Sequence, residues 1–238
     1  ITADNSTIYA SYFSQMDAYS EGYAGIGVWR AAFKPFVDRI ADNDIRLQWF
    51  CCDRSTGVDT EDKDGKPIRV TLLRDTKTPA SVEYQAVKFI GTGRENIQAG
   101  TFSGWELGDY IYMRSEEAYL IKIEALAHKN SPDAVTELEN FMKTRQPDYD
   151  YTFTNKADLI EEIIYQKRVE FWGEGLEYID NRRLNIPVDR TDETWGAENN
   201  NHFSAAKFRY NQEERPFLYQ LPISEIENNS QISPSDQN

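Results

Sequence analysis

The chain has 238 residues, of which 39% are hydrophobic and 28% charged, and its formal net charge is −14. This length suits one large domain or two small ones and is enough to bury a core. The acidic balance argues against a nucleic-acid partner, because such affinity comes largely from cations placed on phosphates, and the lack of an apolar run of about eighteen residues predicts no membrane-spanning helix.

The N-terminal part of the chain predicts irregular structure with short elements. A weak helical spacing leads into the glycine-rich loop Glu21–Trp29. Pro35 is placed to begin a short helix, whose apolar face is Phe33, Phe36, Val37 and Ile40. Alternating residues then predict three strands, at Arg46–Cys52, Ile68–Leu72 and Val82–Ala86. A polar, glycine-rich connector, Gly91–Gly108, ends this part.

The cysteine and histidine residues give no metal-binding spacing. Cys51 and Cys52 are adjacent, and a disulfide between neighbours violates the usual geometry, so we expect free thiols. His128 and His202 are isolated in the sequence. Asp59–Pro67 resembles a calcium loop, but its first and twelfth positions lack the acids that the ion requires, and a solvated hairpin turn is the better interpretation. We therefore predict no metal and no cofactor.

A helical region follows. Eight of the ten residues from Ala118 to Ala127 are apolar, which predicts a helix packed on most sides. Ser131 is a good N-cap for a second helix, with Pro132 at its first position. The buried stripe of this second helix is Ala134, Leu138, Phe141 and Met142. The two helices are expected to be antiparallel neighbours.

A third helix begins after Asn155, and Gly173 and Gly175 break it before a short helix that ends near Leu184. Its buried face is expected to contain Leu159, Ile160, Ile163, Ile164, Phe171 and Trp172. Asn185–Arg215 is predicted to be a long loop, and the chain is expected to close with an extended apolar segment and polar turns. Helix pairs of this length are typical of tetratricopeptide-type units, which cannot bury their faces alone.

Four ordered motifs resemble one protein family. The first is Asp44, Arg46 and Leu47. The second is Asp109, Tyr112, Arg114, Glu117, Tyr119, Leu120, Glu124 and Ala125. The third is Arg168, Glu170, Glu174, Gly175, Asp180, Arg182 and Arg183, with Gln166 and Lys167 in place of the usual acid and arginine. The fourth is Pro222, Ile223, Glu225, Ile226 and Asn228. Together they resemble the C-terminal half of the SusD/RagB family of nutrient-binding outer-membrane lipoproteins.

The resemblance implies a fold, a location and a partner. The fold is mainly α and SusD-like, with tetratricopeptide-type helix pairs, long loops and a few short β-strands. Residues 1–108 would form a loop-rich mixed region that faces the ligand, and residues 109–238 the SusD-like helical region. The chain would be a C-terminal fragment or an unusually short member, forming one compact domain or part of a larger protein.

The implied function is non-enzymatic binding of a glycan or similar nutrient. The protein would act at the cell surface and deliver the nutrient to a SusC-like TonB-dependent transporter of the outer membrane. A lipid anchor outside this chain would be its link to the membrane.

The charged residues of the family motifs are expected to brace the scaffold. They lie on or beside apolar helices, where charged side chains are rarely buried unless paired. We expect arginine–carboxylate pairs that fix the angles between helices. The residues concerned are Arg114, Glu117, Arg168, Glu170, Glu174 and Arg183.

Recognition is therefore expected in the aromatic residues of the loops. A sugar ring packs an apolar C–H face on an aromatic ring, while polar side chains bind its hydroxyls. Aromatic residues in the loops do not belong to the apolar stripe of any predicted helix, so the sequence pattern does not place them in the core. The predicted ligand-binding residues are Tyr19, Tyr23, Trp29, Trp105 and Trp195.

Two alternative functions remain open at this stage. A glycoside hydrolase needs two carboxyl groups that flank the scissile bond, and Glu170, Glu174 and Glu177 are spaced to share one helix face. Pairing of these acids with arginine is the simpler interpretation, and we predict no catalytic residue. A helical-repeat scaffold that binds peptides is the other alternative.

Overall fold

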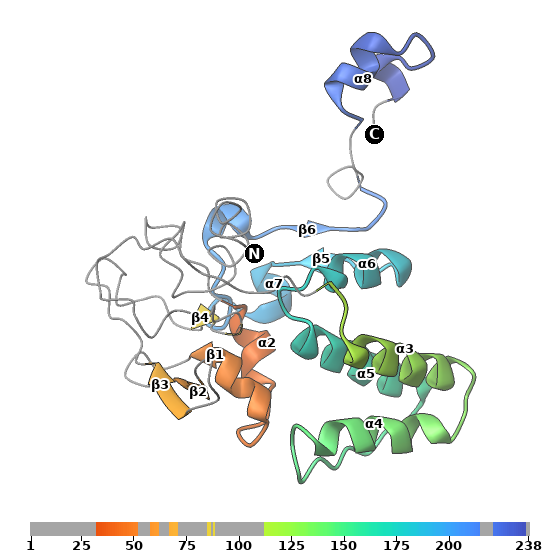
Figure 1. The fold of residues 1–238 in the computed structure, drawn as a ribbon. Coiled ribbons are helices and arrows are strands. Elements are labelled where there is room, and N and C mark those ends of the chain that lie inside the picture. Colours follow the sequence, from red (N-terminus) through yellow and green to blue (C-terminus); the bar gives the residue numbers. More distant parts are fainter. Residues whose placement is uncertain are drawn as a thin grey trace. The chain divides into compact units, whose positions relative to one another are not determined.

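The structure, a computed structural model, describes residues 32–51, 58–61, 67–70, 85–86, 88, 112–214 and 221–236. The chain divides into two compact units, Ile1–Gly173 and Glu174–Asn238. Helices make up most of the regular structure in the described ranges, and the strands there are two to four residues long (Figure 1). This confirms the predicted class. The boundary predicted between residues 108 and 109 lies outside the described residues and stays a prediction.

The first unit begins with short elements and ends with three longer helices. In chain order they are α2 (Lys34–Asp38), the 3-10 helix η2 (Ile45–Trp49), β1 (Phe50–Cys51), β2 (Val58–Glu61), β3 (Pro67–Val70), β4 (Gln85–Ala86), α3 (Ser115–His128), α4 (Asp133–Lys143) and α5 (Lys156–Glu170). β1 pairs with β4 and β2 with β3, both antiparallel. The strand predicted around Ile68 is confirmed. Residues 62–66, the centre of the segment that resembles a calcium loop, lie outside the described residues.

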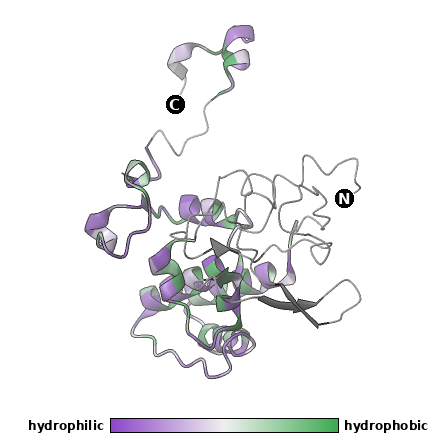
Figure 2. Ribbon diagram, turned by 90° about the vertical axis from the view of Figure 1, so that its left-hand side faces the viewer, coloured by the Kyte–Doolittle hydropathy of each residue, from purple (hydrophilic) through white to green (hydrophobic). Residues whose placement is uncertain are grey.

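Helix α3 packs against both α4 and α5. Helix α4 follows its predicted pattern, because all four residues of the stripe are buried, namely Ala134, Leu138, Phe141 and Met142. Asn155 caps α5 as predicted, and its Oδ1 accepts hydrogen bonds from the backbone N–H groups of Ala157 (2.8 Å) and Asp158 (3.1 Å). Figure 2 shows hydrophilic and hydrophobic residues mixed along the helices. Helix α5 is buried on all sides over Glu162–Lys167.

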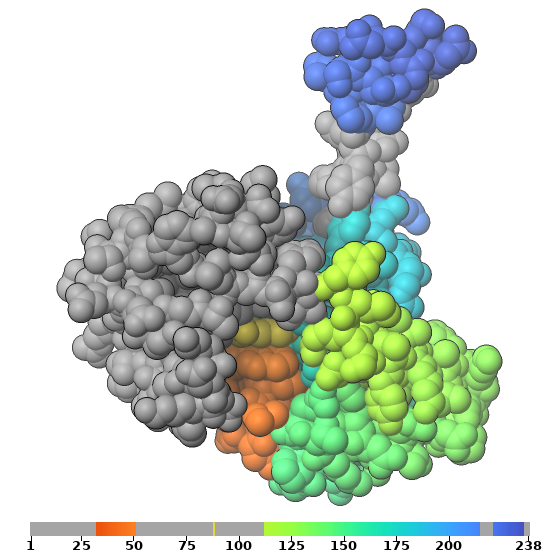
Figure 3. Space-filling view, in the orientation of Figure 1, coloured from red at the N-terminus to blue at the C-terminus, as the bar shows by residue number. Residues whose placement is uncertain are grey.

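Helix α3 has an exposed side, so the prediction that it packs on most sides is wrong. Its buried residues are Leu120, Ile123, Glu124 and Ala127. Ile121 keeps 48% of its surface exposed, and Ala118 and Ala125 are also exposed. The yellow-green residues of α3 lie at the surface in Figure 3. Apolar composition alone therefore overestimated the burial of this helix.

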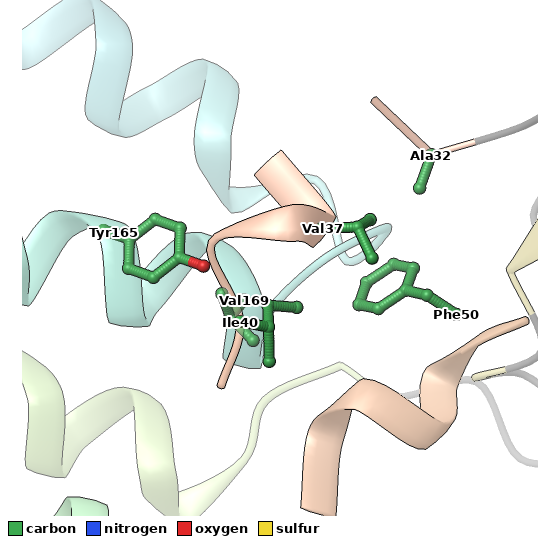
Figure 4. Packing of buried hydrophobic residues seen from close by; sticks show 6 residues of the cluster. All are labelled: Ala32, Val37, Ile40, Phe50, Tyr165 and Val169. Carbon is green, nitrogen blue, oxygen red and sulfur yellow. The ribbon is translucent and has the colours of Figure 1, made fainter. Parts of the chain in front are cut away.

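The short helix α2 and the segment after it pack on the second half of α5. The cluster consists of Ala32, Val37, Ile40, Phe50, Tyr165 and Val169 (Figure 4). Phe36 contacts Phe50 and Tyr165 edge-on, with ring centroids 5.9 and 5.8 Å apart. The Tyr165 hydroxyl donates a hydrogen bond to the Phe36 carbonyl oxygen (3.2 Å). The helix predicted at Pro35 is thus confirmed, and its apolar face is joined to residues more than a hundred positions later in the sequence.

The strand predicted at Arg46–Cys52 is wrong over most of its length. Residues Ile45–Trp49 form the 3-10 helix η2, and only Phe50 and Cys51 are in a strand. Asp44 accounts for the difference, because its Oδ1 accepts a hydrogen bond from the Arg46 backbone N–H (2.9 Å) and so starts the helical turn. The residue buried here is Arg46, at 1% exposure, which an apolar alternation pattern cannot identify.

The second unit consists of short elements. They are α6 (Leu176–Arg183), β5 (Val188–Asp189), α7 (Asp192–Trp195), η4 (Ser204–Ala206), β6 (Arg209–Tyr210), α8 (Ile223–Asn228) and η6 (Pro234–Asp236). The break before α6 occurs where it was predicted. Gly173 and Gly175 adopt φ values of 79° and 85°, which glycine reaches without the steric cost that a Cβ imposes.

Two predictions for the second unit need correction. Asn185–Arg215 was expected to be a long loop, but it contains the antiparallel pair of β5 and β6, with Val188 opposite Tyr210, and the helix α7 between them. The chain was expected to close with an extended apolar segment and polar turns. Residues 215–220 of that part lie outside the described residues, and Ile223–Asn228 forms a helix directly after Pro222. Proline favours the start of a helix, and the apolar residues around it hid that signal.

The cap of α5 gives a test of this helical arrangement. Replacing Asn155 by alanine removes an acceptor for two backbone N–H groups, so the free energy of unfolding should fall by about 1 kcal/mol. Asn140→Ala, at an exposed position of α4, is the matched control and should change it by only a few tenths. Urea unfolding measures both. Equal stability of the two variants would show that Asn155 does not cap α5.

Candidate functional site

Of the five predicted ligand-binding aromatics, the structure describes one. Tyr19, Tyr23, Trp29 and Trp105 lie outside the described residues, and their role stays a prediction. Trp195 is the last residue of α7 and is 38% exposed. Its indole N–H donates a hydrogen bond to the Asp189 carbonyl oxygen (2.9 Å). The ring is therefore held in one orientation while part of it stays accessible to solvent.

The backbone around Trp195 is fixed by the carboxylate of Asp189. This group accepts hydrogen bonds from the Thr191 hydroxyl (2.7 Å), the Thr191 backbone N–H (3.0 Å) and the Thr194 hydroxyl (2.7 Å). It also pairs with Arg209 Nη1 (2.9 Å) on the facing strand β6. Burial acts to raise its pKa, but these hydrogen bonds and the charge of Arg209 prevail and lower the pKa of Asp189 to about 2. The carboxylate is thus ionised at any physiological pH.

A second acid, Asp192, holds the rest of the segment between β5 and β6. Asp192 accepts two contacts from Lys207 Nζ (2.7 and 2.9 Å) and one from Asn200 Nδ2 (2.8 Å). The hydrogen bond from Lys207 is the main reason why the pKa of Asp192 lies below its ordinary value. Gly196 leaves α7 at a φ of 77°. The sequence identified Trp195 but not this support, because its acids and bases are up to twenty residues apart.

Phe203 is an aromatic residue of this segment that the sequence analysis did not single out. It is 75% exposed and precedes η4 directly. A large apolar residue directly after a polar run was the signal available in the sequence. Phe203 therefore joins Trp195 as a candidate contact residue.

A different cluster, centred on Glu170, holds the helices of the first unit together. Arg114 Nη1 lies 2.9 Å from Glu170 Oε1, and Arg145 Nη2 lies 3.2 Å from the same oxygen. Arg46 Nη1 lies 3.5 Å from Oε2. The three arginines come from just before α3, just after α4 and from η2. Arg114 and Glu170 are two of the residues expected to form arginine–carboxylate pairs, and they pair with each other, whereas Arg145 was not expected there.

Carbonyl groups at the C-terminal end of α5 are bound by Arg114 and by a further cation, Lys88. Arg114 Nη2 donates to the Glu170 carbonyl oxygen (2.7 Å), and Lys88 Nζ donates to the same oxygen (2.6 Å) and to that of Trp172 (3.0 Å). Carbonyl groups at the end of a helix have no partner within the helix. The end of α5 thus gains both side-chain and backbone contacts from distant segments.

Glu170 is ionised in this environment. Its side chain is 3% exposed, and burial alone would raise its pKa, but the hydrogen bonds and charges of Arg145, Arg114 and Arg46 hold the pKa below its ordinary value. A general acid for glycoside hydrolysis needs the opposite shift. Glu170 is therefore not suited to be the general acid of the hydrolase hypothesis.

The three acids of that hypothesis do not share a helix face. Helix α5 ends at Glu170, the two left-handed glycines follow, and α6 begins at Leu176. Glu177 is in the first turn of α6, and Glu174 lies between the two glycines. The spacing that motivated the hypothesis assumed a continuous helix, and the glycines interrupt it.

Gln166 and Lys167 replace the usual family charges and are both buried. Arg46 Nη2 donates to Gln166 Oε1 (2.5 Å), and Gln166 Nε2 donates to Glu162 Oε1 (2.7 Å). Lys167 Nζ lies 3.2 Å from Glu124 Oε2 on α3. The amide of Gln166 therefore bridges an arginine and an acid instead of forming an ion pair itself. Arg183, by contrast, pairs with Asp180 within α6 (2.7 Å), so that contact fixes no angle between helices.

Removal of the Glu170 carboxylate should be costly. Glu170→Ala leaves three arginines around a buried site without their shared acid, so we expect a loss of about 3–5 kcal/mol in the free energy of unfolding. Glu139→Ala removes an exposed i,i+4 pair with Lys143 (3.1 Å) and should cost less than about 0.5 kcal/mol. Chemical denaturation at neutral pH checks both. Similar losses for the two variants would contradict the structural role of Glu170.

The pH dependence of stability provides an independent test. A carboxylate whose folded pKa lies below its unfolded value stabilises the fold above the unfolded pKa, and this contribution is lost as the pH falls through the folded pKa. The reference value for Glu170 is 4.5. The stability difference between the wild type and Glu170→Gln should therefore be constant near neutral pH and shrink as the pH falls below this value. A difference that grows on acidification would mean that the pKa of Glu170 is raised.

Comparison with known proteins identifies the family. The SusD family model matches residues 31–238. Among solved structures, the chain is similar to a SusD-like carbohydrate binding protein from Bacteroides vulgatus, with 20% identity and a TM-score of 0.60. The match covers 98% of this chain and 46% of the other, so the chain spans about half the length of that protein. No curated protein matches the sequence.

The structural likeness supports the fold, and the family match covers most of the chain. The mainly helical architecture with short strands is SusD-like, as the sequence motifs predicted. In the ranges that the structure describes, no helix combines the length and apolar character needed to cross a membrane. The match over residues 31–238 carries the conclusion that this chain belongs to the SusD family.

Proposed function

We propose that this protein binds a glycan or a similar nutrient at the cell surface without converting it chemically. The bound nutrient passes to a SusC-like TonB-dependent transporter of the outer membrane, and a lipid anchor outside this chain holds the protein there. Family membership supports the general function. The similar structure from Bacteroides vulgatus is described as a carbohydrate binding protein, which supports a glycan as the ligand.

The observation that carries the proposal is the partly exposed, oriented indole of Trp195. Its N–H is bound to the Asp189 carbonyl, and the carboxylate of Asp189 is bound by two threonines and an arginine. A ring held in this way loses little side-chain entropy when a ligand packs on it. The apolar faces of sugar rings are suited to such a surface. Residues 1–108 are proposed to supply further aromatic contacts.

The absence of chemical conversion is part of the proposal. Glu170, the best-placed acid of the hydrolase hypothesis, has a lowered pKa and three arginine partners. A binding protein needs no acid–base pair, whereas a glycosidase does. Incubation of the whole protein with the glycan that it binds should release no reducing ends. Release of reducing ends that Glu170→Gln abolishes would support a hydrolase instead.

Substitution of Trp195 tests the proposed binding surface. A glycan array identifies a ligand for the whole protein, and calorimetry measures its affinity. Trp195→Ala should weaken binding by about tenfold, because it removes the stacking contact and the area buried under it. Trp195→Phe keeps an apolar ring face and should weaken binding less. Phe203→Ala, at the second candidate contact residue of the segment, should also weaken binding, whereas Asn140→Ala on the exposed side of α4 should leave the affinity unchanged.

The aromatics outside the described residues are tested in the same assay. Tyr23→Ala and Trp29→Ala should each weaken binding of the same glycan several-fold. Unchanged affinity in these two variants and in Trp195→Ala would show that the proposed residues are wrong. A whole protein that captures peptides and no glycan on the arrays would favour the peptide-binding alternative.

A further inference from the structure

A cavity of about 220 Å³ lies in the first unit beside the buried polar network. Its walls come from the turn between α2 and η2, from residues 146–151 and from one face of α5. Pockets for drug-sized ligands enclose roughly 300–1,000 Å³. This cavity is therefore large enough for one small ring but not for an extended chain.

The lining combines aromatic and apolar surface. Tyr149, Tyr151 and Tyr165 contribute rings, and Ile40 and Val169 contribute aliphatic groups. Tyr149 and Tyr165 are 6% and 8% exposed, so their rings are fixed by the surrounding core. The Arg39 guanidinium covers one face of the Tyr165 ring, 3.9 Å from its centroid. The C–H groups of a ligand would therefore contact mainly Tyr149, Tyr151 and the aliphatic groups.

The two buried acids of the lining are paired with arginines, and the third acid, Asp150, is exposed. Arg39 Nη2 lies 2.8 Å from Glu162 Oε2, and the Arg46 guanidinium contacts both carboxylate oxygens of Asp44 (2.6 to 3.2 Å). Each buried acid of the cavity thus already has an arginine partner. An ion that binds at these two buried acids would have to compete with the pairs, whereas a neutral polar ligand would not.

The tyrosine hydroxyls retain hydrogen-bonding capacity. Tyr149 donates its proton to Glu162 Oε1 (3.2 Å), and Tyr165 donates its proton to the Phe36 carbonyl (3.2 Å). A phenolic oxygen that donates in this way can still accept a hydrogen bond. Burial is the main cause that raises the pKa of both groups, so they keep their protons in the physiological range. Each phenolic oxygen thus keeps the capacity to accept one further hydrogen bond.

We propose that this cavity is a second binding site, which takes a neutral, hydroxyl-rich ring of monosaccharide size. Aromatic rings and aliphatic groups contact the C–H face, and the phenolic oxygens with the outer parts of Arg39 and Gln146 contact the hydroxyls. The choice of a sugar as ligand rests on the proposed function. The cavity itself is independent of Trp195, because its lining residues all belong to the first unit.

A substitution that fills the cavity tests the proposal without removing an ion pair. Ala41 lies in the lining, on the turn after α2, and its carbonyl accepts a hydrogen bond from the Asp44 backbone N–H (2.9 Å). Ala41→Trp keeps that backbone contact and places a large ring into the opening. The matched control is Ala125→Trp, on the exposed side of α3. Thermal unfolding establishes that both variants fold.

Binding is measured on the whole protein by saturation-transfer NMR with methyl glycosides of glucose, galactose, mannose and xylose. A ligand of this size is expected to bind with a Kd on the order of millimolar. The wild type, Ala125→Trp and Trp195→Ala should give equal signals for at least one glycoside, and Ala41→Trp should lose at least tenfold in affinity. If Ala41→Trp does not fold, Tyr151→Ala, which removes a partly buried wall, should weaken binding several-fold.

Two results would overturn the second site. One is unchanged glycoside binding in Ala41→Trp, or in Tyr151→Ala where that variant is used. The other is a wild type that binds an oligosaccharide but none of the methyl glycosides at up to about 50 mM, well above a millimolar Kd. In the second case the proposed function stands and the cavity assignment fails. A wild type that binds neither kind of sugar contradicts both.

Discussion

The described part of the first unit depends on one buried acid. Glu170, at the end of α5, contacts arginines that are 124, 56 and 25 residues earlier in the chain, at positions 46, 114 and 145. Burying such charges is costly unless each is paired and hydrogen-bonded. The contacts therefore favour this arrangement of η2, α3, α4 and α5, because it pairs the buried charges. Lys88 and Arg114 strengthen it by binding the carbonyl groups that α5 leaves open.

The same physical principle supports the candidate recognition surface of the second unit. There Asp189 and Asp192 hold a short segment in place through threonines, Arg209 and Lys207, and the segment presents Trp195. Acids thus serve as fixed acceptors inside both units, and a large ring is left partly exposed in one of them. This arrangement agrees with the proposed role, in which the protein binds a nutrient and affinity comes from shape and stacking.

Local signals in the sequence predicted the local structure well. The α4 stripe, the Asn155 cap and the left-handed glycines at 173 and 175 each depend on residues within one or two turns. Features set by distant partners were missed. In the sequence, Arg145 resembles an exposed cation at the end of a helix, and its contact with Glu170 cannot be recognised. Arg46 lies in a pattern typical of a strand, but the hydrogen bond from its backbone N–H to Asp44 starts a helical turn instead. The exposed side of α3 was likewise hidden by its apolar composition. Of the candidate binding residues, only Trp195 could be compared with the structure, and its support by Asp189 could not be read from spacing.

The central claim is that the buried charges hold the fold while exposed rings bind the ligand. The most direct test measures two properties of one variant, Glu170→Gln, at neutral pH and at a temperature where it remains folded. The account predicts a clearly lower free energy of unfolding with unchanged affinity for the glycan that the wild type binds. A variant of normal stability that no longer binds the glycan would show that Glu170 belongs to the binding site, and would contradict the account.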